Sequence, residues 1–82
     1  MVERFLIETT SGYDEISQSQ IQDLKSQGYH QAIFVIEYNN NKGHYYETAH
    51  LWTKDHQIGE TFDEFCHRIA QEFLSWVCLV LG

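Results

Sequence analysis

The sequence predicts an α+β domain with the element order β-α-β-β-α. Three observations support this order: two helix-start signatures, two β-rich segments separated by turn residues, and enough apolar side chains for one hydrophobic core. The chain has 82 residues, of which 43% are hydrophobic and 15% aromatic. A chain of this size can bury only one hydrophobic core, so residues 1–82 are expected to form a single domain.

The first two elements are a strand and a short helix. Residues 2–8 are rich in Phe, Leu and Ile and are typical of a strand, and 9–13 are expected to form a loop. Ser17 and Gln20 have the spacing of a capping box, which predicts a helix over 18–27. The buried stripe of this helix would be thin, because glutamine dominates its sequence.

A β-hairpin follows, and then a long helix. Residues 29–38 and 44–53 are β-rich, and the residues between them tolerate positive φ, as a hairpin turn requires. Thr61 and Glu64 form a second capping box, which predicts a helix from there to the end of the chain. Its apolar residues recur at helical spacing: Phe62, Phe65, Ile69, Phe73, Trp76 and Val80.

These elements predict a three-stranded antiparallel sheet with the last strand in the centre and two helices on one face. The right-handed crossover rule places the first helix on that face, and the terminal helix would join it. The arrangement resembles a split β-α-β unit, a truncated ferredoxin-like fold that lacks a final edge strand. It is too common to imply a function.

The two faces of the hairpin differ in character. With Tyr38 opposite His44, one face carries Ile33, Val35, Ala49 and Leu51, and we assign this aliphatic face to the core. The other face would be open, and its apolar patch would be formed by Phe34, Ile36, Tyr46 and Trp52. The reverse assignment is equally supported, and a shift of one residue in register would pair the faces differently.

The nine residues 73–81 contain one polar side chain and no charge. A helix through them is apolar on every side, and one small domain can cover only one side. We therefore predict that another protein surface covers this end, and that it first mediates self-association about a two-fold axis. The predicted interface residues are Phe73, Trp76, Val77, Leu79, Val80 and Leu81, together with Phe34, Ile36, Tyr46 and Trp52 of the open face.

The net charge limits which partners the protein can bind, and the cysteines bear on its cellular compartment. The net charge of −7 opposes direct binding to nucleic acid or to an anionic membrane, but it permits a basic protein partner. Cys66 and Cys78 would lie about 18 Å apart along one helix, too far for a disulfide. Reduced thiols, no signal segment and an apolar run too short to span a bilayer predict a cytoplasmic protein.

No group of side chains predicts catalysis, a cofactor or a metal. His44 and His50 would lie about 20 Å apart on one strand, too far to share an ion. Cys66 belongs to the apolar helical stripe and is expected to be a buried, inert thiol. Glu37 and Glu47 could approach each other near the hairpin tip, but no cleft is evident around them.

The sequence thus predicts a small acidic cytoplasmic protein-interaction module, homodimeric and not an enzyme. It would act as a regulator or inhibitor by occupying a partner protein's surface, for which a basic nucleic-acid-binding protein is a suitable target. The alternative is a small-molecule or metal-binding domain that uses His30, His50, Tyr46 and Trp52. A third interpretation is a structural subunit of a larger complex.

Overall fold

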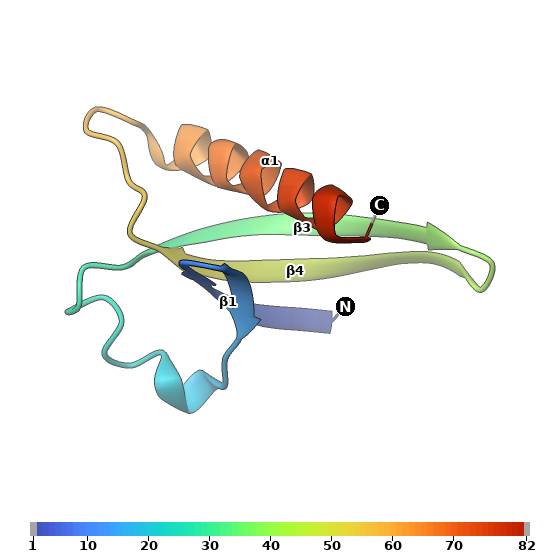
Figure 1. The fold of residues 1–82 in the computed structure, drawn as a ribbon, viewed down its shortest axis with the longest axis horizontal. Helices are drawn as coiled ribbons and strands as arrows, with labels where there is room; N and C mark the ends of the chain where they lie inside the picture. Colours follow the sequence, from blue (N-terminus) through green and yellow to red (C-terminus); the bar gives the residue numbers. More distant parts are fainter. Residues whose placement is uncertain (1, 82) are drawn as a thin grey trace.

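The computed structural model describes residues 2–81, with side chains to Val80, as a four-stranded sheet and one long helix (Figure 1). The elements are β1 (Val2–Thr9), β2 (Gly12–Glu15), the 3-10 helix η1 (Gln18–Gln20), β3 (His30–Asn40), β4 (Gly43–Thr53) and α1 (Phe62–Leu81). The strand order is β2-β1-β4-β3. β1 runs parallel to β4, whereas the β1–β2 and β3–β4 pairs are antiparallel, so the sheet is mixed.

The predicted three-stranded antiparallel sheet with two helices on one face is therefore wrong. The sheet has an additional edge strand, β2, which pairs with β1 from Leu6↔Glu15 to Thr9↔Gly12. Its four residues are too few to show an alternating pattern, and they lie in and just after the segment expected to be a loop. The central position predicted for the last strand is confirmed, because β4 lies between β1 and β3.

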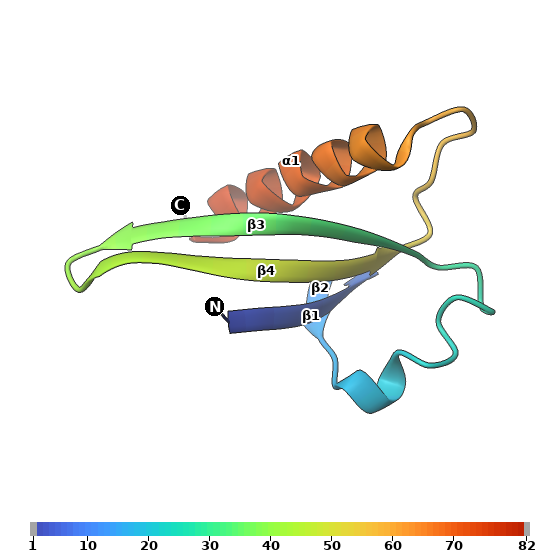
Figure 2. The same ribbon diagram turned by 180° about the vertical axis from the view of Figure 1, so that it is seen from behind.

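The helix predicted over 18–27 does not form, although its start signal is present. The backbone N–H of Ser17 donates to Oε1 of Gln20 at 2.8 Å, but helical structure is limited to η1 and is followed by turns. Leu24 is the one buried residue between positions 18 and 27. Because an isolated helix of about ten residues is marginal in water, a single buried leucine is too little to stabilise it. Residues 18–20 lie on the opposite side of the hairpin from α1 (Figures 1 and 2).

The β3–β4 hairpin is confirmed, but its register differs by one residue from the prediction. Tyr38 pairs with Tyr45 rather than His44, and the strands are joined by two residues between Asn40 and Gly43. Gly43 has φ +132°, which favours glycine at the end of this tight turn. As a result, the side of β4 that faces the core is the predicted one, whereas the side of β3 that faces the core is the opposite of the predicted one.

The core lies between α1 and one face of the sheet. Ala32 and Leu51 are opposite each other on this face and have no exposed surface. The buried core residues are Leu6, Ala32, Ile36, Ala49, Leu51, Phe65, Cys66, Ile69 and Phe73. The Thr61–Glu64 capping box is confirmed in both directions, with two hydrogen bonds of 3.1 Å.

Arg68 fixes the loop that leads into α1. Its Nε donates to Glu60 at 2.6 Å, and its Nη1 lies 3.0 Å from Oδ2 of Asp55. The hydrogen bond from Arg68 lowers the pKa of the Glu60 carboxyl below its usual value. This ion-pair network holds the start of the helix over the sheet.

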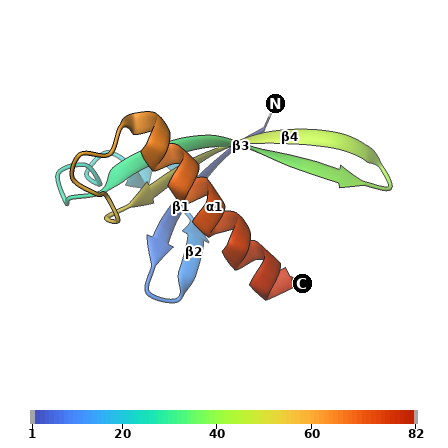
Figure 3. The same cartoon turned by 90° about the horizontal axis from the view of Figure 1, so that it is seen from above.

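α1 crosses the sheet diagonally and diverges from the hairpin towards its C-terminal end (Figure 3). The distal half of the hairpin extends beyond the body of the molecule on the same side as the C-terminal end of α1, at an angle to the helix. No helix among residues 2–81 combines the length and apolar character needed to cross a membrane.

Candidate functional site

The C-terminal half of α1 has both buried and exposed apolar residues. Phe73 is buried in the core, and Trp76 and Val77 are half-buried against it. Leu79 is 84% exposed and Val80 is 59% exposed. The predicted interface residues of this helix thus fall into a group that packs within the fold and a pair that faces outwards. The side chain of Leu81 lies outside the described residues.

Trp76 packs against β2. Its ring packs edge-on against Tyr13 at a centroid distance of 5.1 Å, and Tyr13 packs in the same way against Phe73. The indole also lies over Gly12, where an added Cβ would come within 2.8 Å of it. The short edge strand therefore supports the last turns of the helix.

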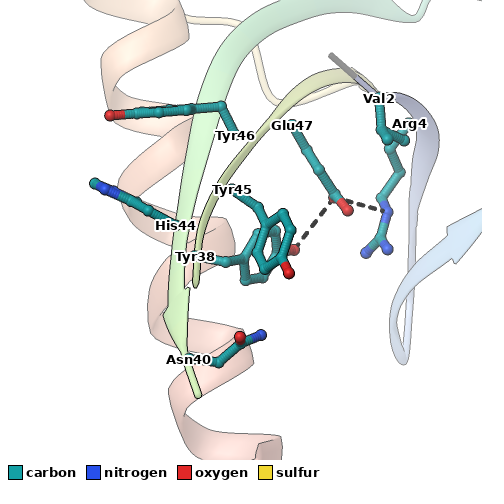
Figure 4. Close-up of a pocket in the computed structure, with 8 residues that line it drawn as sticks. All are labelled: Val2, Arg4, Tyr38, Asn40, His44, Tyr45, Tyr46 and Glu47. Carbon is teal, nitrogen blue, oxygen red and sulfur yellow. Dashed lines mark hydrogen bonds and ion pairs between the residues drawn. The ribbon is translucent and has the colours of Figure 1, made fainter. Parts of the chain in front are cut away.

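A groove lies where α1 diverges from the hairpin, and we call it the C-terminal groove. Its inner part has a volume of about 250 Å³ and is lined by Leu6, Tyr13, Tyr38, Trp76, Val77 and Val80, among others. Its outer part is larger, about 710 Å³, and lies along the distal hairpin (Figure 4). Arg4 and Tyr38 line both parts, so the two hollows adjoin.

The polar side chains of the groove pair with one another. Tyr38 donates from its hydroxyl to Oε2 of Glu47 at 3.3 Å, and Arg4 Nε lies 3.4 Å from the same oxygen (Figure 4). Arg4 also pairs with Glu15 at 3.4 Å. Burial, and then the charge of Glu47, raises the pKa of Tyr38. The carboxylates of Glu15 and Glu47 share the single guanidinium of Arg4, so the floor of the groove has a net negative charge between apolar walls.

Tyr13 beside this groove makes the stability of the fold sensitive to alkaline pH. Burial, followed by the charge of Glu8, raises the pKa of Tyr13 from 10.0 to about 12. Between these values the unfolded chain loses its phenolic proton while the native protein retains it, so we expect stability to fall as pH rises. Urea denaturation across this interval should show a falling midpoint. Tyr13→Phe should flatten that dependence, and an equally steep slope in the variant would contradict the assignment.

The apolar patch predicted for the open face of the sheet is not present. Phe34 and Ile36 face α1, and Ile36 and Trp52 are only 6% and 8% exposed. Of the four residues predicted there, Tyr46 is exposed, and its ring stacks on His44 at 5.0 Å. The one-residue difference in register brings Ile33 and Val35 to this face instead.

The predicted ligand set His30, His50, Tyr46 and Trp52 converges only in part: His30 and Trp52 line one hollow, and His50 and Tyr46 do not. His30 and His50 lie on opposite faces, because His50 is opposite Ile33 in the sheet. His50 is already bonded to Gln31 at 2.9 Å and to Glu3 at 3.1 Å. Within residues 2–81 no three histidine, cysteine or acidic side chains come together as a metal site would require.

The candidate nucleophile and acid pair do not form reactive sites either. Cys66 is buried, and its Sγ accepts a hydrogen bond from the Ile33 backbone N–H at 3.4 Å. Cys66 and Cys78 are both free thiols, as predicted. Glu37 and Glu47 lie on opposite faces of the sheet; Glu37 pairs with His44, and Glu47 pairs with Arg4. The best candidate for a binding surface is therefore the C-terminal groove together with the exposed end of α1.

Comparison of the chain with known protein families, with curated proteins and with solved structures finds no match.

Proposed function

We propose that the protein is a small interaction module that uses the C-terminal end of α1 and the C-terminal groove to bind another protein surface. The observation that carries the proposal is an apolar groove lined by Val80, which is 59% exposed, with Leu79, 84% exposed, at the same end of the helix. Burying a large apolar side chain contributes roughly 1.5–3 kcal/mol, so covering both is a substantial driving force for association.

The first partner we propose is a second copy of the chain. Each copy has a projecting Leu79 at the same helix end as a hollow lined by Trp76, Val77 and Val80. A two-fold axis near this end would let each copy place its Leu79 against the hollow of the other, as an isologous interface requires. This contact would use the inner part of the groove, and the outer part along the distal hairpin would remain outside it.

The remaining surface suits a basic target. The net charge is −7, and the groove floor has two carboxylates for one guanidinium. An acidic dimer would associate fastest with a positively charged protein, through electrostatic steering. We propose that it acts there as a regulator or inhibitor by covering the partner's functional surface.

Leu79→Glu tests the self-association. A carboxylate at this position cannot be buried against an apolar wall without a large desolvation penalty, so we expect at least about tenfold weaker dimerisation. Sedimentation equilibrium across micromolar concentrations measures it. Ile58→Glu is the matched control, because Ile58 is an equally apolar and exposed side chain in a loop remote from the groove.

Both variants should keep the circular dichroism of the wild type. A wild-type monomer throughout the concentration range would contradict the proposal, as would equal weakening by the two substitutions. Trp76→Ala is a poor substitute for Leu79→Glu, because Trp76 packs on Tyr13 and Phe73 and its loss would disturb the fold.

A further inference from the structure

A second hollow lies where β3 begins, away from the C-terminal groove. Its volume is about 530 Å³, and its lining includes Lys25, Tyr29, His30, Trp52, His56 and Phe62. These residues come from the 16–29 segment, the two inner ends of the hairpin strands, the loop after β4 and the start of α1. We call it the histidine hollow.

Uncompensated positive charge gathers at this hollow in an otherwise acidic protein. Of the five lysines and arginines, Arg4 and Arg68 are held by carboxylates. Among residues 2–81, the three lysines form no ion pair with a carboxylate, and two of them lie here. Lys25 lines the hollow, and the Lys54 ammonium lies 4.9 Å from the centre of the Tyr29 ring in its wall.

The walls of the histidine hollow are flat rings. His30 and His56 stack with centroids 4.4 Å apart and an interplanar angle of 19°. Phe65 supports both imidazoles edge-on from the core side. Phe62 is 59% exposed at the rim. Trp52 also lines the hollow, and its buried indole N–H has no hydrogen-bond acceptor among the residues that the structure describes.

We propose that the histidine hollow binds a small planar aromatic carboxylate. The ring of the ligand would lie against the His56 and Phe62 side chains, where aromatic faces favour stacking over aliphatic contact. Its carboxylate would meet the ammonium of Lys25, which has no competing carboxylate. The inference is independent of the proposed dimer, because it uses a different end of the molecule.

Three probes separate the contributions of ring and charge. 2-Naphthoate has both, 2-naphthalenemethanol has the ring without the charge, and cyclohexanecarboxylate has the charge without the ring. Titration followed by NMR should show 2-naphthoate shifting the Trp52 indole N–H and the His30 and His56 ring protons. Both other probes should bind about threefold to fivefold more weakly, as expected for loss of one ion pair or one aromatic contact.

Two lysine variants provide the matched test. Lys25→Gln should weaken 2-naphthoate binding by about threefold to fivefold, whereas Lys42→Gln in the hairpin turn should leave it unchanged. Both lysines are exposed, so neither substitution should affect folding. The inference is overturned if the two variants weaken binding equally, if the uncharged probe binds as tightly as 2-naphthoate, or if the shifts are absent or map to the C-terminal groove.

Discussion

Phe65→Ala is expected to remove a large share of the stability of the fold. Phe65 is 2% exposed and lies in the core between α1 and the sheet, where it also supports the stacked imidazoles of His30 and His56. Truncating a buried phenylalanine to alanine costs about 3–5 kcal/mol. A domain of 82 residues has a total stability of about 4–12 kcal/mol, so this loss removes a large share of it.

Phe62→Ala is the matched control for this prediction. Phe62 lies on the same helix, one turn earlier, but 59% of its surface is exposed. Urea denaturation followed by circular dichroism should show a change of less than about 1 kcal/mol for Phe62→Ala. Equal losses in the two variants would show that the helix does not pack with the orientation described.

Gly12→Ala is expected to be the most damaging substitution among the four glycines that the structure describes. A Cβ at this position would come 2.8 Å from Nε1 and Cζ2 of Trp76, closer than any real contact allows. The φ of Gly12 is +142°, which an alanine adopts with strain. Strain and overpacking together predict a loss of about 2–4 kcal/mol.

Gly59→Ala separates the backbone strain at positive φ from the collision with Trp76. Gly59 also has positive φ, +85°, but nothing lies within 4 Å of its added Cβ. It should therefore show the conformational strain without the collision, at about 1 kcal/mol. Trp76 should also move in Gly12→Ala, which would change its near-ultraviolet circular dichroism. Equal losses in both variants would place the Trp76 ring elsewhere.

The parts of the fold that local chemistry specifies could be predicted from the sequence. The hairpin and α1 follow from turn residues and from the Thr61–Glu64 capping box. The register of β3 could not be predicted, because both strands alternate equally well when one slips by a residue. The Ser17–Gln20 box was equally clear, yet tertiary packing gave the segment after it too little burial to form a helix.

The surfaces were predictable to different degrees. The exposure of Leu79 and Val80 follows from an apolar end that exceeds what one sheet can cover. The burial of Ile36 and Trp52 depends on the strand register, which the sequence leaves open. Two residues of the histidine hollow, His30 and Trp52, belong to the predicted ligand set. The contact of His30 with His56 is not predicted, because these residues are 26 positions apart and meet only when the loop after β4 folds back over β3.

The parallel pairing of β1 with β4 has a consequence for how the chain acquires its structure. Leu6 pairs with Leu51, so the residues of β1 obtain this neighbour only after the ribosome has made the later strand β4. The β3–β4 hairpin closes a short loop and can form first, whereas β1 must close a long one, which is slow. Until then the Phe5, Leu6 and Ile7 side chains remain uncovered on the nascent polypeptide, where a chaperone or a neighbouring chain could capture them.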